Sequence, residues 1–182
     1  LYGIENLALI PGTVGAAPVQ NIGAYGVELD QFFVELEAFD LKTGEIRQMG
    51  KADCQFAYRD SIFKQDPGQK LVILSVTLQL ALEPALEIGY AGLADVLAGQ
   101  QVTPQSVFDA VCAIRSSKLP DPKQIGNAGS FFKNPVVSKA KLLSLRKSYP
   151  ELPAWNTEDA DLVKVPAAWL LDQKGWKGKR RG

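Results

Sequence analysis

Glycine and proline interrupt the first 28 residues so often that only turns around short segments are expected there. This mostly apolar stretch contains five glycines and two prolines, namely Gly3, Pro11, Gly12, Gly15, Pro18, Gly23 and Gly26. Two interpretations fit: short buried segments joined by turns, or a surface on which a flat or phosphorylated ligand approaches backbone amides closely. The stretch lacks a GxGxxG pattern and a P-loop lysine, so neither nucleotide-binding fingerprint applies.

A second glycine-containing segment, residues 126–135, reads GNAGSFFKNP. Gly126 and Gly129 permit backbone angles that are closed to other residues, so the hydroxyl of Ser130 is expected at a turn. Two phenylalanines follow the serine, and then a lysine and an asparagine. Phenylalanines beside a serine are unusual in a surface loop, so the segment predicts a binding or catalytic site.

Composition excludes several classes of protein. The 182 residues are 46% apolar, which suffices for a packed core, and 20 basic side chains balance 20 acidic ones. Zero net charge argues against a nucleic-acid partner. The two cysteines lie far apart, so we expect no metal site and no disulfide framework, and a reducing compartment such as the cytoplasm fits best. No apolar run is long enough to span a membrane.

The lack of histidine and the lack of an initial methionine limit what can be expected of the chain's chemistry and extent. Without any histidine, proton transfer must use a carboxylate, Lys, Tyr, Ser or Cys. The chain starts at Leu1, its only methionine is Met49, and it stops after a basic run. We therefore expect a piece of a longer protein.

The middle of the chain predicts strands, and the rest predicts helices. Residues 33–41 and 45–49 flank a Lys-Thr-Gly turn and predict a hairpin. Residues 74–80 alternate apolar and polar side chains, which predicts a half-buried strand with one apolar face formed by Leu74, Val76, Leu78 and Leu80. Between them, residues 58–64 are polar and aromatic, which fits either a surface loop or a pocket wall.

Three helices are predicted from their capping signals. The first follows Thr103 and Pro104 and ends before Leu119-Pro120. The second follows Ser138, and the third covers residues 167–174. The stiff Pro-Asp-Pro sequence at residues 120–122 is the best candidate for a domain boundary.

Taken in order, four segments resemble one family. Residues 4–15, 21–26, 58–61 and 126–135 are similar to those of UDP-N-acetylenolpyruvoylglucosamine reductase, also called UDP-N-acetylmuramate dehydrogenase, and the likeness continues through residues 167–173. This flavoenzyme family completes UDP-N-acetylmuramic acid for peptidoglycan.

The resemblance implies an α+β fold in two parts. Residues 1–118 would be the later part of a mixed α/β FAD-binding domain, and residues 119–182 the start of a smaller α+β substrate-binding domain. The family's flavin pyrophosphate loop is expected before Leu1, and a third catalytic residue, a glutamate, after Gly182. A chain without them is expected to be inactive alone.

The resemblance also implies cofactors, a substrate and site residues. NADPH would reduce FAD, and reduced FAD would reduce the enolpyruvyl ether of UDP-N-acetylglucosamine-enolpyruvate. Arg59 would stabilise negative charge at the substrate carboxylate and Ser130 would donate the proton. Positions expected to contact FAD are Pro11, Gly12, Gly15, Ile22 and Gly23. Positions expected to bind substrate are Tyr58, Tyr90, Lys118 and Asn134.

Several alternatives stay open. Tyr90 could simply end a strand, and Lys118 could serve only as a favourable charge at a helix C-terminus. Tyr25 could lie beside the cofactor or in the core. For the whole chain, the alternatives are another flavin-dependent oxidoreductase of similar build and a noncatalytic ligand-binding module.

Overall fold

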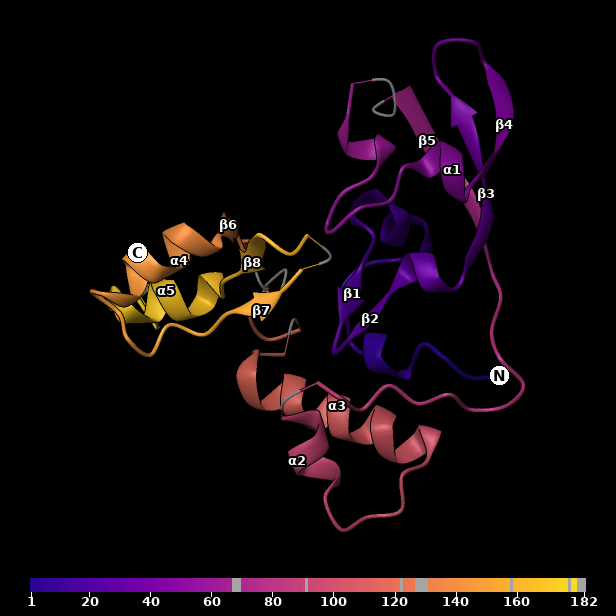
Figure 1. The fold of residues 1–182 in the computed structure, drawn as a ribbon. Coiled ribbons are helices and arrows are strands. Elements are labelled where there is room, and N and C mark those ends of the chain that lie inside the picture. Colours follow the sequence, from indigo (N-terminus) through magenta and orange to yellow (C-terminus); the bar gives the residue numbers. More distant parts are fainter. Residues whose placement is uncertain are drawn as a thin grey trace. The chain divides into compact units, whose positions relative to one another are not determined.

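The computed structural model describes residues 1–66, 70–90, 92–121, 123–126, 131–157, 159–176 and 178–179. The chain forms two compact units, Leu1–Gly129 and Ser130–Gly182, called here the first and second units. Helices and antiparallel sheets occur in both (Figure 1). The predicted α+β class is confirmed.

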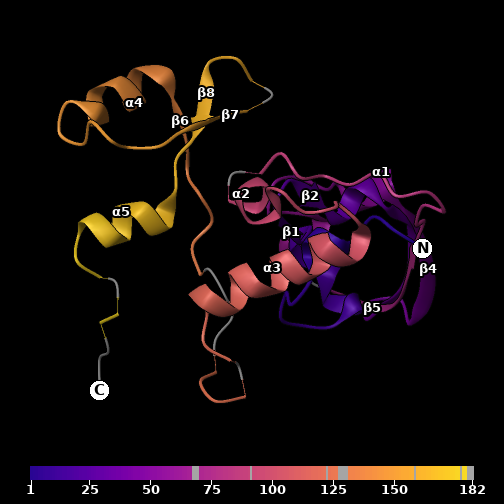
Figure 2. The same cartoon turned by 90° about the horizontal axis from the view of Figure 1, so that it is seen from below.

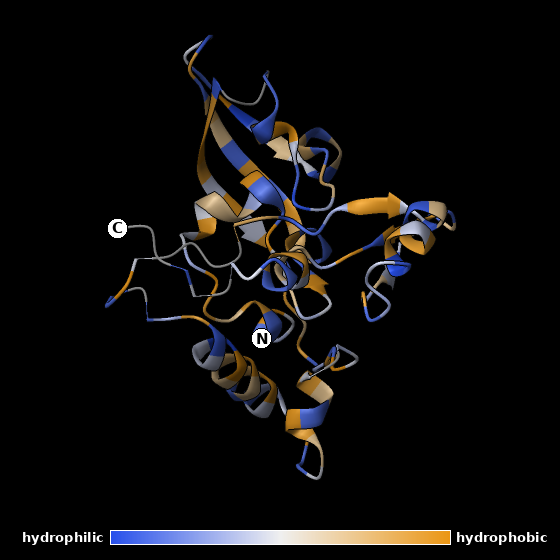
Figure 3. Cartoon of the chain, turned by 90° about the vertical axis from the view of Figure 1, so that its left-hand side faces the viewer, coloured by the Kyte–Doolittle hydropathy of each residue, from blue (hydrophilic) through white to orange (hydrophobic). Residues whose placement is uncertain are grey.

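The main sheet of the first unit has the strand order β4-β3-β5. Its strands are β3 (Phe33–Asp40), β4 (Glu45–Gly50) and β5 (Leu71–Leu78), and β3 pairs antiparallel with both neighbours. The predicted hairpin is therefore confirmed. Hydrophobic and hydrophilic segments are interspersed along the chain (Figure 3), and in β3 buried and exposed positions are interspersed, as expected for a sheet with one buried face.

The third strand of this sheet corrects one sequence-based expectation. On β5, Ile73 pairs with Ala38 and Ser75 pairs with Glu37, so Leu74 is an extra residue at an irregularity in the ladder. Because a bulge of this kind shifts the alternation of side chains, Leu74 is 53% exposed, whereas Ile73 packs against the core. The prediction that Leu74 and Val76 share one face of the strand is therefore wrong for Leu74.

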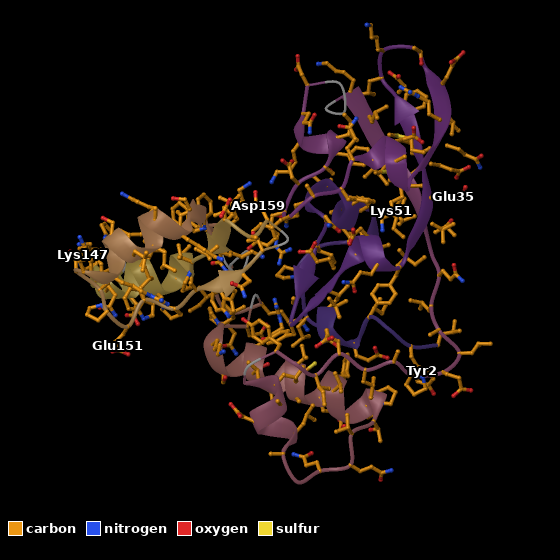
Figure 4. All side chains as sticks on the ribbon, viewed as in Figure 1. Tyr2, Glu35, Lys51, Lys147, Glu151 and Asp159 are labelled. Carbon is orange, nitrogen blue, oxygen red and sulfur yellow. The ribbon has the colours of Figure 1, made fainter. Side chains whose placement is uncertain are left out.

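A hydrophobic core lies against the inner face of this sheet. Its buried residues are Phe33, Leu36, Ala38, Met49, Cys54 and Phe63. Two short helices close it, α1 (Lys51–Cys54) and the 3-10 helix η4 (Ile62–Lys64). Lys51 on α1, labelled in Figure 4, donates a 2.7 Å hydrogen bond to the carbonyl oxygen of Asp30.

The glycine-rich opening forms only short elements, as its composition predicts. They are the 3-10 helices η1 (Glu5–Leu7), η2 (Val14–Gln20) and η3 (Leu29–Gln31) and the strands β1 (Gly23–Ala24) and β2 (Val27–Glu28). The buried Asn6 amide donates 2.8 Å hydrogen bonds to the carbonyl oxygens of Tyr25 and Glu87. The hydrogen bonds of Asn6 thus connect three segments that are far apart in the sequence.

Two helices complete the first unit. α2 (Leu93–Leu97) and α3 (Pro104–Lys118) lie side by side (Figure 2) and share a buried apolar cluster. The Thr103 hydroxyl accepts a hydrogen bond from Ser106 N, and Ser106 Oγ accepts one from Thr103 N, so the predicted cap is a reciprocal capping box. Tyr25 packs against this cluster, which supports the core position for its ring.

The second unit is a small sheet with two helices. Strands β6 (Val136–Ser138), β7 (Trp155–Asn156) and β8 (Leu162–Lys164) form a sheet of order β6-β8-β7. The helices α4 (Lys139–Arg146) and α5 (Ala167–Gln173) confirm the two predicted there. The core of this unit includes Leu142, Leu152, Val163 and Val165, and Lys147 and Glu151 lie on its surface (Figure 4).

The described residues contain neither a helix that could span a membrane nor a cluster of metal-binding side chains. None of the helices there has the length and apolar run that crossing a bilayer requires. In the same part of the chain, His, Cys, Asp and Glu nowhere gather in a group of three or more that could hold a metal ion.

Candidate active site around Arg59

Arg59 lies in a tight turn that projects its side chain toward the glycine-rich opening. Ala57 and Asp60 exchange two backbone hydrogen bonds of 3.0 Å, and Arg59 between them has a φ of 54°. A left-handed backbone is uncommon for a residue with a Cβ, and such conformations are concentrated at functional sites. The turn is also held by Lys64, which donates a 2.8 Å hydrogen bond to the Arg59 carbonyl oxygen.

The guanidinium of Arg59 has several partners in the first unit. Nη1 lies 3.0 Å from Glu28 Oε1 and 3.5 Å from the Asn21 carbonyl oxygen. Nη2 donates to the Gly23 carbonyl oxygen. Cζ lies 4.9 Å from the centroid of the Tyr58 ring, a cation–π distance. Tyr58 thus lies beside Arg59, and the guanidinium has a fixed position.

Asn21 fixes the carboxylate that faces Arg59. Its side chain is buried, and its amide nitrogen donates a 3.1 Å hydrogen bond to Glu28 Oε2. Its amide oxygen accepts a 3.0 Å hydrogen bond from Asp30 N. Glu28 therefore has one oxygen on Asn21 and the other on Arg59, so a buried amide orients the ion pair.

Gly23 makes room for this ion pair. A Cβ atom at Gly23 would lie 2.8 Å from Arg59 Nη1, 2.8 Å from Glu28 Cγ and 3.0 Å from the Val27 carbonyl oxygen. Non-bonded contacts this short do not occur at real Cβ atoms, so a larger residue would force the pair or the backbone to move. This close packing explains a glycine here without reference to any ligand.

A cavity of about 420 Å³ lies along the glycine-rich opening, in the size range of ligand sites. Most of its walls are apolar, and Phe108 of α3 contributes to them. Pro11, Gly12 and Ile22, three of the positions expected to contact FAD, line it. Gly12 has a φ of +116°, which a residue with a side chain rarely adopts.

The cavity fits one part of a flavin nucleotide. Its mostly apolar lining suits a flat ring system. Glu5 is the single charged residue among the described residues that line it, so no cation there matches a diphosphate. The residues that line the cavity therefore suit the ring portion of FAD, and a diphosphate there would depend on backbone N–H donors.

Two other positions expected to contact FAD do not themselves line the cavity, although Val14 and Ala16, which flank Gly15, do. A Cβ atom at Gly15 would have the Ile73 carbonyl oxygen as its nearest neighbour, at 3.9 Å, which places Gly15 beside the sheet. Gly23 lies at the Arg59–Glu28 pair. Neither belongs to the set that lines the cavity. Their expected contact with FAD stays a prediction.

The expected substrate-binding residues have varied surroundings. The Tyr90 ring is 44% exposed and packs edge-to-face on Tyr25 with ring centroids 5.2 Å apart, and burial raises the pKa of Tyr25. Lys118 is exposed in the last turn of α3, where its charge is favourable next to the helix C-terminus. For both residues, the substrate role stays a prediction.

Asn134 lies in the second unit and has a clear structural contact. Its side-chain oxygen accepts a 3.0 Å hydrogen bond from Ala167 N, the first residue of α5. The oxygen thus caps a helix N-terminus from a distance of 33 residues along the chain. Ser130, the expected proton donor, lies outside the described residues.

Sequence reasoning assigned no role to Asn21 or Glu28. One signal could have identified Glu28: only Glu5 and Glu28 are charged among the first 28 residues. A carboxylate within an apolar, glycine-rich stretch needs a partner, and Arg59 is that partner. Asn21 gave no comparable signal, because its role depends on its burial.

The fold of the chain is similar to that of a reductase whose crystal structure is known. A crystal structure of UDP-N-acetylenolpyruvylglucosamine reductase from Thermus caldophilus aligns with 99% of this chain and 48% of its own, at a TM-score of 0.60 and 23% sequence identity. At that identity the match concerns the fold alone. It places the chain in the α+β class of that reductase.

Sequence comparisons narrow the class to a family. Residues 121–182 match the family model for the C-terminal domain of UDP-N-acetylenolpyruvoylglucosamine reductase. The proteins of that name from Amoebophilus asiaticus and Porphyromonas gingivalis are 50% and 51% identical to this chain, over 98% and 100% of its length and 53% and 54% of theirs. The chain belongs to the UDP-N-acetylenolpyruvoylglucosamine reductase family. It spans about half the length of these curated relatives.

Proposed function

We propose that the chain contributes to an enzyme that reduces UDP-N-acetylglucosamine-enolpyruvate to UDP-N-acetylmuramate, with FAD as cofactor and NADPH as reductant. Family membership and the reductase names of its relatives support an oxidoreductase. The product is a peptidoglycan precursor, and an NADPH-dependent step in its synthesis is expected in the cytoplasm.

The observation that carries this proposal is the guanidinium of Arg59, fixed beside Tyr58 and next to the glycine-rich opening. Once reduced by NADPH, bound FAD would supply a hydride to the enolpyruvyl double bond. Negative charge then develops at the neighbouring carbon and spreads into the substrate carboxylate. A preorganised cation near that carboxylate stabilises the charge where it forms, and we assign this role to Arg59.

Ser130 is the residue we propose as proton donor. A serine hydroxyl is a weak acid, but a carbanionic carbon is a very strong base, so a well-placed hydroxyl suffices. This assignment also agrees with a chain that contains no histidine. Tyr58, Tyr90, Lys118 and Asn134 are proposed to bind the substrate. Residues 1–118 and 119–182 are proposed as parts of the FAD-binding and substrate-binding domains.

The test separates the two half-reactions in the complete, flavin-loaded protein and not in this chain alone. Stopped-flow absorbance should show NADPH reducing the flavin and the enolpyruvyl substrate reoxidising it. Ser130→Ala should leave reduction unchanged and slow reoxidation by at least about 100-fold. A wild-type protein whose reduced flavin is not reoxidised by this substrate would refute the proposed function. Equal slowing of both steps by Ser130→Ala would instead remove Ser130 from the mechanism.

A further inference from the structure

The Arg59 side chain has its ion-pair partner 31 residues earlier in the sequence. Glu28 Oε1 lies 3.0 Å from Arg59 Nη1, and the two side chains are 31% and 26% exposed. Partial burial makes such a pair stronger than an exposed one, since less water competes for the charges. The carboxylate is therefore a main determinant of where the guanidinium lies.

The surrounding contacts restrict both partners of this pair. Glu28 Oε2 accepts from the buried Asn21 amide, so the carboxylate cannot turn away without breaking a second hydrogen bond. Nη2 of Arg59 donates to the Gly23 carbonyl oxygen, and Gly23 has no side chain that would separate the pair. Both terminal nitrogens of the guanidinium are thereby held, Nη1 by Glu28 and Nη2 by Gly23, and the Tyr58 ring lies close to the group.

We propose that Glu28 is the positioning residue for Arg59, which it orients for the substrate carboxylate. This inference depends on the proposed function, because it concerns the step in which Arg59 acts. Glu28 acts through Arg59 and does not itself contact a reacting atom. The negative charge of Glu28 also offsets the positive charge of Arg59. Glu28 therefore contributes the orientation of the guanidinium and adds no positive charge to the site.

Glu28 orients Arg59 and also offsets its charge, so removing the charge of Glu28 should lower the rate of flavin reoxidation without raising the apparent KM for the substrate. Glu28→Gln keeps the size of the side chain but removes its charge. Arg59 then loses its orientation, and the rate of flavin reoxidation at saturating substrate should fall about 10-fold to 100-fold. The substrate carboxylate no longer competes with the charge of Glu28, so the apparent KM should stay equal or fall. NADPH reduction of the flavin should not change.

A double-mutant cycle tests whether Glu28 works through Arg59. In an Arg59→Lys background the ammonium has no planar fork to orient, so adding Glu28→Gln should slow reoxidation less than about 3-fold further. Glu37→Gln is the matched control, because Glu37 is a carboxylate whose hydrogen bond to Ser75 Oγ, 2.8 Å long, is exposed. It should change neither half-reaction.

Nuclear magnetic resonance of the arginine guanidinium groups gives a readout independent of turnover. In the wild-type protein the Arg59 Nη hydrogens should exchange slowly, and in Glu28→Gln they should exchange at the rate of a solvated arginine. Glu28→Asp, which keeps the charge, should restore part of the protection and part of the reoxidation rate.

Three outcomes would overturn the positioning role. They are unchanged reoxidation in Glu28→Gln, equal slowing of both half-reactions, and an equal effect of Glu28→Gln with and without Arg59. Should the wild-type protein fail to reoxidise its flavin with the enolpyruvyl substrate, the proposed function is refuted. The guanidinium spectra would still show whether Glu28 holds Arg59.

Discussion

The hydroxyl of Ser61 donates a 2.7 Å hydrogen bond to the carbonyl oxygen of Val19, which lies at the end of η2. Ser61 has no exposed surface, and its Oγ also accepts a hydrogen bond from Phe63 N. The hydrogen bond between Ser61 and Val19 joins the turn that contains Arg59 to the glycine-rich opening. Ser61→Ala should therefore lower the free energy of unfolding by about 1–3 kcal/mol, measured by urea denaturation, because the buried N–H of Phe63 loses its acceptor and the Val19 carbonyl oxygen loses its donor.

Ser75→Ala is the control for this prediction. Ser75 Oγ donates to Glu37 Oε2 at 2.8 Å on the exposed face of the sheet, where water can replace it. Its removal should change the free energy of unfolding by less than about 0.5 kcal/mol. A loss for Ser61→Ala as small as that of Ser75→Ala, below about 0.5 kcal/mol, would show that the Ser61–Val19 contact contributes little.

Gly23→Ala should damage both stability and the proposed reaction. The new methyl group would lie 2.8 Å from Arg59 Nη1 and 3.0 Å from the Val27 carbonyl oxygen, so backbone as well as side chains must move. We expect a loss of about 1–3 kcal/mol in unfolding free energy and slower flavin reoxidation. Gly50→Ala is the control, since the nearest atom to a Cβ there lies 3.7 Å away. Normal stability of Gly23→Ala would contradict the close packing.

The stability of the β3–β4 hairpin should depend on the charge of Asp40. Hydrogen bonds from the backbone N–H groups of Lys42 and Thr43, and from Arg47, hold the pKa of Asp40 below its ordinary value despite burial. A lowered pKa in the folded state stabilises the fold above the unfolded pKa, near 3.8, and this contribution is lost as the pH falls through the folded pKa.

Asp40→Asn tests this dependence. The variant should unfold at lower urea concentration than the wild type at pH 7, and the difference should shrink as the pH is lowered below about 4. Urea denaturation at a series of pH values measures it. A difference that stays constant down to pH 2 would show that the charge of Asp40 does not stabilise the hairpin.

Features with a local cause could be predicted from the sequence. Thr103 followed by Pro104 predicted where α3 begins, and the capping box has that geometry. The hairpin and α4 were predicted for the same reason, because turn and cap residues act within a few positions. The frequent glycines likewise predicted the short elements of the opening.

Features that depend on distant residues could not be predicted. The bulge at Leu74 arises from pairing with Glu37 and Ala38 on another strand, and periodicity within β5 does not encode it. Glu28 and Arg59 are 31 residues apart, so only the fold reveals that they pair. Arg59 itself was identified by family resemblance, whereas its partner required the structure.

Cys54 should be unreactive in the folded protein. Burial raises its pKa to about 11, the nearby charge of Asp53 contributes, and the side chain has no exposed surface. At pH 8 only about one thiol in a thousand would be ionised, and reagents cannot reach it. Alkylation followed by mass spectrometry should modify the partly exposed Cys112 first and Cys54 only in denaturant. Equal rates for the two thiols would contradict this burial.

Asn134 can be tested for capping and substrate binding separately, because the two roles use different atoms of its amide. Its oxygen caps α5 at Ala167 N, whereas a ligand phosphate would need its N–H donors. Asn134→Ala should therefore lose about 1 kcal/mol of unfolding free energy. Asn134→Asp keeps the capping oxygen and adds a negative charge at a helix N-terminus, so stability should be retained. If the residue also binds the substrate, the aspartate variant should raise the substrate KM while its thermal stability stays normal. An unchanged KM in a stable Asn134→Asp protein would limit Asn134 to its cap.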